Sequence, residues 1–98
     1  MPQSDSREHV YARVLVSGRV QGVGYRAFTQ RVGTARRLAG GVRNLDTGQV
    51  ELEVEGSRAV IEDLLAELRK GPVGSRVTQV QVEWSTAADR FTDFQIWY

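Results

Sequence analysis

The feature that most constrains the fold of this chain is the way its hydrophobic period changes along the sequence. In two segments the apolar residues recur every three or four positions, which is typical of amphipathic helices. Elsewhere they alternate with polar residues or form short runs bounded by glycine, which is typical of strands. The resulting order is strand, helix, strand, strand, helix, strand and a short final strand. The predicted strands are residues 9–17, 40–45, 49–55, 77–84 and 94–98.

Each predicted helix has an apolar stripe and a recognisable start. The first begins at Tyr25, after a run of glycines, and the second follows Ser57, a residue type that caps helix N-termini. Gly71 followed by Pro72 stops the second helix. The first stripe consists of Tyr25, Phe28, Val32 and Ala35, and the second of Val60, Ile61, Leu64, Leu65 and Leu68.

This order predicts an α+β, ferredoxin-like fold, a βαββαβ sandwich with a short extra strand at the C-terminal end. The sheet is expected to be mostly antiparallel, with both helices on one face. Its first two strands run parallel, and the third lies antiparallel between them. The loop after the first strand and the end of the second strand then emerge at the same edge. Arg26 and Asn44, which are far apart in the sequence, are therefore expected to meet.

Composition narrows the class of protein. The length of 98 residues favours one domain, and we expect a polar tail over residues 1–8 and a folded domain over 9–98. The net charge of +1 is too small for a nucleic-acid-binding surface. The absence of cysteine excludes disulfides and cysteine-ligated metals. No apolar run approaches a membrane span, and the polar N-terminal segment is unlike a signal peptide. We therefore expect a cytoplasmic monomer with no membrane or nucleic-acid partner.

The glycine-rich loop between the first strand and the first helix is a candidate anion site. Glycines let consecutive backbone amides turn toward one point, and a helix N-terminus adds partial positive charge. Arg26, in the first helical turn, adds a permanent charge and a planar fork of donors that matches phosphate. The predicted phosphate-binding residues are Gln21, Gly22, Val23, Gly24, Tyr25 and Arg26. The alternative is a tight turn in which Arg26 forms only a surface ion pair.

Asn44 is the second candidate. Asparagine is depleted in strands, yet this residue lies near the end of a predicted strand. Its carboxamide has both a donor and an acceptor, so it can hold a water molecule and direct it at phosphorus without acting as a base. The alternative is that Asn44 only begins the hairpin turn over residues 46–48, because asparagine favours turns.

Other patterns carry less weight. Gly22 and the residues after it fit a dinucleotide-binding pattern, but a hairpin follows immediately instead of the alternating strands and helices that such a fold needs. His9, the only histidine, has no metal-ligand spacing, and no metal site is expected. Two groups are predicted to be structural: Glu51, Glu53 and Glu55 on a solvated sheet face, and Trp84, Trp97 and Tyr98 in core or edge packing.

Two longer motifs resemble those of the acylphosphatase family. Residues 16–26 read VSGRVQGVGYR, and residues 40–44 read GGVRN, with Gly48, Val50 and Gly56 at the family's spacing. The resemblance covers about residues 10–98. It implies hydrolysis of acyl phosphates to a carboxylate and inorganic phosphate, without metal or cofactor. It also implies that Arg26 binds phosphate and that Asn44 orients the attacking water.

The sequence departs from the family pattern at three positions. Tyr25 replaces the usual phenylalanine, Gly41 the usual aromatic residue and Arg37 a glycine that usually ends the first helix. Gly41 is expected to leave its strand less packed, because glycine has no side chain to bury. The competing function is a non-catalytic domain that binds an acyl or carbamoyl phosphate. Retention of both Arg26 and Asn44 argues against it, because binding alone needs no water-positioning amide.

Overall fold

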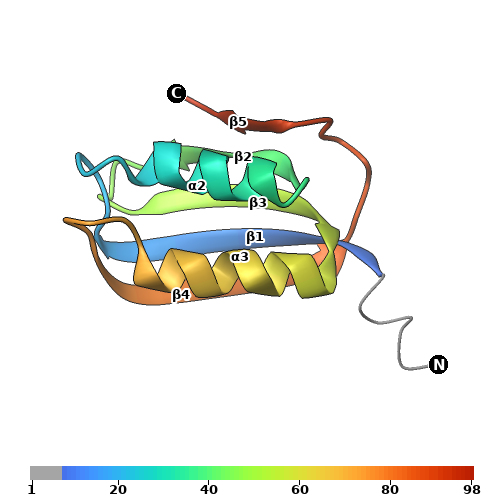
Figure 1. Ribbon diagram of the computed structural model, residues 1–98, viewed down its shortest axis with the longest axis horizontal. Coiled ribbons are helices and arrows are strands. Elements are labelled where there is room, and N and C mark those ends of the chain that lie inside the picture. Colours follow the sequence, from blue (N-terminus) through green and yellow to red (C-terminus); the bar gives the residue numbers. More distant parts are fainter. Residues whose placement is uncertain (1–7) are drawn as a thin grey trace.

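The computed structural model of the protein describes residues 8–98, so the predicted tail lies outside the described residues except for Glu8. The predicted order of elements is confirmed (Figure 1). The final strand is shorter than predicted, and the first is longer by Gly18 and Arg19. The elements are β1 (His9–Arg19), α2 (Tyr25–Ala35), β2 (Ala39–Asn44), β3 (Val50–Ser57), α3 (Arg58–Lys70), β4 (Arg76–Thr86) and β5 (Phe94–Ile96).

The strand order across the sheet is β4-β1-β3-β2-β5. Strand β3 pairs antiparallel with β1 and β2, β4 pairs antiparallel with β1, and β5 is parallel to β2. Helices α2 and α3 lie side by side over one face of this sheet (Figure 1). The ferredoxin-like fold is thereby confirmed. Val50 pairs with Val16 on one side and with Asn44 on the other, so the ends of β1 and β2 lie at the same edge.

The core lies between the sheet and the helices. Alternate residues of β1 and β3 point into it, as period-two strands require. The helix α3 contributes the predicted stripe, with Val60 only partly buried. The buried apolar residues of these three elements are Val10, Ala12, Val14, Val16, Val50, Leu52, Val54, Ile61, Leu64, Leu65 and Leu68.

Helix α2 packs differently from the prediction. Phe28 and Val32 are only partly buried, and the prediction that Ala35 faces the core is wrong because Ala35 is exposed. The reason is a close approach between Gly33 and the ring of Phe94 in β5. A Cβ atom on Gly33 would lie 2.6 Å from Phe94 Cδ2, so only glycine lets β5 approach this helix so closely. The buried residues of α2 are Tyr25, Thr29 and Gly33.

Gly41, in β2, also makes room for an aromatic ring, on the face of the strand that points away from the helices. A Cβ atom on Gly41 would lie 2.0 Å from Trp97 Cε2, so the indole ring occupies the space of the missing side chain. The Trp97 backbone N–H also donates a hydrogen bond to the Val42 carbonyl (2.7 Å). The expectation that Gly41 leaves β2 less packed is therefore wrong. An aromatic residue covers this strand, but it comes from the segment after β5.

Arg37 adopts the left-handed conformation that usually selects glycine, with φ of 58°. Its N–H donates to the Thr34 carbonyl (3.0 Å), and the N–H of Leu38 donates to the Gly33 carbonyl (3.0 Å). These bonds form the Schellman motif that closes many helices. The helix therefore ends in the geometry that glycine favours, although an arginine occupies the position.

Arg37→Gly is expected to stabilise the protein by about 0.5–1 kcal/mol, because glycine adopts positive φ without the steric cost of a Cβ atom. Equilibrium urea denaturation measures the change. Arg36→Gly is the comparison, because Arg36 has φ of −97° and gains nothing from glycine. It also loses the ion pair of Arg36 with Glu67 (3.7 Å), so this variant should be less stable than the wild type. A destabilised Arg37→Gly variant would show that contacts of the arginine side chain outweigh the backbone strain.

Candidate active site

An open pocket of about 180 Å³ lies where the β1–α2 loop, the end of β2 and the segment after β5 meet. Arg26 and Asn44 both line it, as the topology predicts. Gly22 and Gly24 line the loop side, together with Tyr25 at the start of α2. The residues whose side chains could act on a ligand therefore come from separate elements that the sheet register brings together.

The backbone of the loop is shaped by two glycines with left-handed φ angles, 74° at Gly22 and 77° at Gly24. Space is not the constraint, because no atom lies within 4 Å of a Cβ built on either residue. Gly24 is the N-cap of α2, and no side chain caps the first amides of the helix. These amides and the positive end of the helix dipole are therefore available to an anion.

Gln21 connects the loop to the hairpin that carries Asn44. Its Nε2 donates to the carbonyls of Leu45 (2.8 Å) and Gln49 (2.9 Å). Gln21 and Val23 do not line the pocket, whereas the other predicted loop residues do. The side chain of Gln21 thus fixes the loop relative to the end of β2.

Tyr25 anchors the start of α2 in the core. Its ring is buried, and its hydroxyl donates to the carbonyl of Leu68 in α3 (2.8 Å). Burial raises the pKa of the Tyr25 hydroxyl well above its ordinary value, so this group stays protonated. The extra hydroxyl relative to phenylalanine therefore satisfies one of the last carbonyls of α3, and it is not free to bind a ligand.

Arg26 is half-buried, and its guanidinium faces the ring of Tyr98, with Cζ 5.3 Å from the ring centroid. Across residues 8–98 no carboxylate forms an ion pair with Arg26. The alternative interpretation, in which Arg26 only forms a surface ion pair, therefore lacks a carboxylate partner in this part of the chain. Its in-plane N–H donors are available to the pocket.

Asn44 is exposed at the end of β2, and within the described part of the chain its carboxamide has no hydrogen-bond partner. The hairpin is closed without it, because Leu45 N–H donates to the Gln49 carbonyl (2.8 Å) and Gly48 N–H to the Leu45 carbonyl (3.1 Å). The Thr47 hydroxyl adds a bond to Gln49 Oε1 (2.8 Å). The side chain of Asn44 is thus not needed for the turn.

Beyond the predicted residues, Ile96 and Tyr98 line the pocket on the side of β5. The prediction that Tyr98 serves core or edge packing is wrong, because its side chain is fully exposed. The signal that identifies them is the alternation of Phe94, Ile96 and Tyr98 along the final strand. Alternate residues share a face, and Phe94 already faces α2, where the pocket begins.

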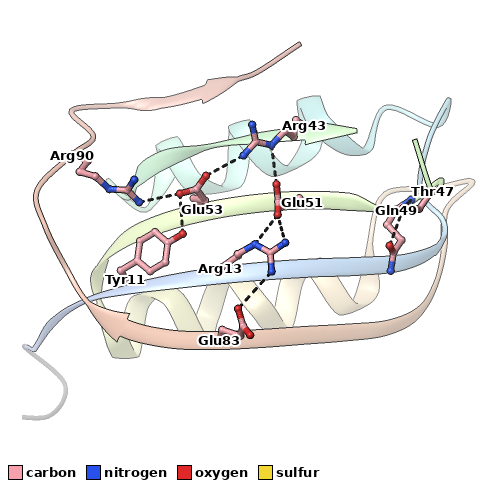
Figure 2. A network of polar contacts seen from close by, with 9 residues as sticks. All are labelled: Tyr11, Arg13, Arg43, Thr47, Gln49, Glu51, Glu53, Glu83 and Arg90. Atoms are coloured by element: carbon pink, nitrogen blue, oxygen red, sulfur yellow. Dashed lines mark hydrogen bonds and ion pairs between the residues drawn. The ribbon is translucent and has the colours of Figure 1, made fainter. Parts of the chain in front are cut away.

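The acidic residues of β3 lie on the sheet face opposite the helices, where Glu51 and Glu53 form a charged network with arginines (Figure 2). The expectation of a solvated face is wrong, because Glu51 is 7% exposed and Glu55 only 2%. Glu51 accepts hydrogen bonds from Arg13 Nε (2.7 Å) and Arg43 Nε (2.8 Å). Glu55 accepts the backbone N–H groups of Ala88 and Arg90, which fixes the segment before β5.

Glu53 extends this network along β3, away from the end that pairs with Asn44. It accepts hydrogen bonds from Arg43 (3.1 Å), Arg90 (3.0 Å) and the Tyr11 hydroxyl (2.8 Å). Arg43 directly precedes Asn44, and its guanidinium lies over the ring of Trp97, 5.1 Å from the centroid. The network therefore fixes the end of β2 and the segment after β5, the two elements that carry Asn44 and Tyr98.

One group of possible metal ligands comes together among residues 8–98: His9, Glu55 and Asp89. His9 Nε2 lies 3.2 Å from Asp89 Oδ1. None of these residues lines the pocket, and no aspartate, glutamate or histidine does. In the described part of the chain, neither helix has the length and apolar character required to cross a bilayer.

Comparisons with known proteins agree with the fold and the motifs. The sequence matches the Acylphosphatase family over residues 12–96. It is 45% identical over 96 residues to an acylphosphatase of Salinibacter ruber, covering 96% of this chain and 97% of that protein. It is also 45% identical to an acylphosphatase of Methanococcoides burtonii, covering 87% of this chain and 88% of that protein. The crystal structure of acylphosphatase from Bacillus subtilis matches with a TM-score of 0.88 and 37% identity, covering 91% of this chain and 99% of that chain.

The network around Glu51 predicts a pH-dependent contribution to stability. Burial would raise the pKa of Glu51, but hydrogen bonds from Arg43 and Arg13 outweigh it, so this pKa lies below its ordinary value of 4.5. The stabilisation is therefore complete above pH 4.5 and is lost as the pH falls through the lower pKa of the folded state. Glu51→Gln should lower the free energy of unfolding at pH 7 by about 1–3 kcal/mol, and the difference should shrink in acid.

Urea denaturation at pH 7 and in acid measures this difference. Glu83→Gln is the control, because Glu83 also pairs with Arg13 but its side chain is 78% exposed. Such an exposed pair contributes at most about 1 kcal/mol. A Glu51→Gln effect that is the same at both pH values would contradict the ionic origin of the stabilisation.

Proposed function

This chain belongs to the acylphosphatase family, and we propose that it hydrolyses acyl phosphates. In the proposed site, Arg26 and the loop amides bind the phosphate, and Asn44 positions the attacking water. The observation that carries the proposal is that Arg26 and Asn44 line one pocket beside the uncapped start of α2. The substrate is a small acyl phosphate, and neither metal nor cofactor takes part.

Phosphate recognition rests on the loop and the helix N-terminus. Amides of Gly22 and Gly24, in left-handed conformations, and the first amides of α2 donate to phosphate oxygens. The guanidinium of Arg26 donates two parallel hydrogen bonds. Because Arg26 has no carboxylate partner across residues 8–98, its charge is not compensated by the protein. Charge that develops on the phosphoryl oxygens in the transition state is stabilised by donors already in position.

Asn44 acts on the water. Its carboxamide accepts one water proton in a hydrogen bond or donates to the water oxygen, and so directs that oxygen at phosphorus opposite the acyl group. A P–O bond forms as the bond to the acyl oxygen breaks, and the carboxylate leaves with the electron pair. A carboxylate is a good leaving group and needs no general acid. Because no carboxylate or imidazole side chain lines the pocket, the phosphate of the substrate accepts the water proton.

A non-catalytic phosphate-binding domain would require the same loop and Arg26. It would not require an unbonded carboxamide at the pocket. The hairpin closes through its backbone and Thr47, which leaves the side chain of Asn44 without a structural partner in the described chain. This observation favours turnover over simple binding.

Asn44→Ala tests the water-positioning role. Because the amide acts mainly in the transition state, kcat for benzoyl phosphate should fall by about 10² to 10³. The inhibition constant of inorganic phosphate should change little. Assays are made in excess EDTA, in which the wild type should retain its turnover. Thermal melting of each variant separates loss of activity from loss of the folded state.

Two results would count against this role. A folded Asn44→Ala protein with wild-type kcat and a lower melting temperature would leave Asn44 as a turn residue. Equal losses of kcat and of phosphate affinity would make it a binding group. Asn44→Asp is the companion variant, because it keeps the size but adds a negative charge and should weaken phosphate binding as well.

Arg26→Lys tests phosphate recognition. Lysine keeps the charge but loses the planar fork of donors. We expect kcat/KM to fall by about 10² or more, as when one preorganised transition-state donor is removed. Arg31→Lys is the matched control, since Arg31 is exposed on the same helix and does not line the pocket. Near-normal kinetics in a folded Arg26→Lys protein would remove Arg26 from the site.

A further inference from the structure

The pocket has an apolar side that phosphate chemistry does not use. Ile96 and Tyr98 line it opposite the loop, and neither offers a cation or a backbone amide nest to the phosphate. Their presence in a pocket built around an anion site needs a second explanation. An acyl phosphate has two parts, and the uncharged acyl group is the part that apolar side chains would contact.

The side chain of Tyr98 is fully exposed although it is large and aromatic. Within residues 8–98, the large hydrophobic side chains that are fully exposed are Val73 and Tyr98. Val73 is in the α3–β4 loop, away from the pocket lining, whereas Tyr98 borders the pocket. An aromatic side chain provides a large, rigid contact area at small entropic cost. An exposed ring at the edge of a pocket is therefore suited to contact a ligand.

The contact between Tyr98 and Arg26 leaves both groups able to bind substrate. A guanidinium stacks through its flat face and donates hydrogen bonds in its plane. The ring of Tyr98 lies over Arg26, 5.3 Å from Cζ to the centroid, and so does not compete for the in-plane donors. Arg26 and Tyr98 line the same pocket, so a phosphate bound at those donors would lie next to the ring.

The segment that carries Tyr98 is fixed by its neighbours. Trp97 fills the space beside Gly41, and its N–H donates to Val42 (2.7 Å). The Trp97 ring also packs against Phe91, with centroids 5.7 Å apart, and against Arg43. Tyr98 therefore follows an anchored residue, although its own side chain is exposed.

We infer that Tyr98, with Ile96, binds the acyl group of the substrate and makes the protein prefer acyl phosphates with an aromatic or extended apolar acyl group. This inference rests on the proposed function, because it requires phosphate at Arg26. The ring of Tyr98 acts through contact area and not through its hydroxyl. The preference should therefore survive removal of the hydroxyl and disappear with the ring.

The test compares benzoyl phosphate with acetyl phosphate in wild type, Tyr98→Ala and Tyr98→Phe. Tyr98→Ala should lower kcat/KM for benzoyl phosphate about 10-fold, mainly through KM, the scale of one aromatic contact. Acetyl phosphate and the inhibition constant of inorganic phosphate should change less than about 3-fold, because neither presents a large acyl group. Tyr98→Phe should retain the preference. Val73→Ala, the variant of the other exposed side chain, should leave all values unchanged.

Two outcomes would overturn the inference. An equal loss for both substrates and for phosphate inhibition would show that Tyr98 acts only through the orientation of Arg26. Unchanged kinetics in Tyr98→Ala would show that the ring does not contact the acyl group. Neither outcome affects the proposed function, which fails instead if the wild type does not hydrolyse either acyl phosphate or if phosphate does not inhibit it.

Discussion

The position of β3 between β1 and β2 is the constraint on which the rest of the structure depends. Val50, the first residue of β3, pairs with Val16 on one side and with Asn44 on the other. This register aligns the end of β1, where the glycine loop begins, with the end of β2. Gln21 then fixes the loop to the hairpin through the carbonyls of Leu45 and Gln49. A slip of one residue would reverse the faces of β3 and separate the loop from Asn44.

The sequence was sufficient to predict the topology, the apolar stripe of α3 and the meeting of Arg26 with Asn44. Each of these follows from local periodicity combined with the handedness of connections. Contacts between distant segments were not predictable in this way. Gly33 gave no signal in the sequence, and Gly41 was expected to leave its strand less packed. Each is nevertheless required by an aromatic ring of the final segment, Gly33 by Phe94 and Gly41 by Trp97. Periodicity gives the face of a residue but not the partner that covers it.

The glutamates of β3 illustrate the same limit. Alternation correctly assigned them to the face away from the helices, but it did not show that arginines from other elements meet them there. Arg43 is opposite Glu51 in the β2–β3 pair, while Arg13 reaches Glu51 from the strand on the other side. Cross-strand pairs of opposite charge stabilise a sheet. The polar face is therefore an ordered part of the structure. The alternation of residues along one strand could not predict its burial, because the burial depends on arginines from other elements.

The placement of the glutamates on the face away from the helices also affects the pocket that contains Arg26. With 13 basic and 12 acidic residues, the chain has nearly enough carboxylates to neutralise every cation. The pleat of β3 directs Glu51, Glu53 and Glu55 to the open face. There, arginine side chains pair with Glu51 and Glu53, and backbone N–H groups of the segment before β5 bind Glu55. The pocket lies on the helix side and contains Arg26 without a carboxylate side chain. A carboxylate there would repel a phosphate dianion and pair with the guanidinium. The alternation that builds the core thus also keeps the anion site free of competing negative charge.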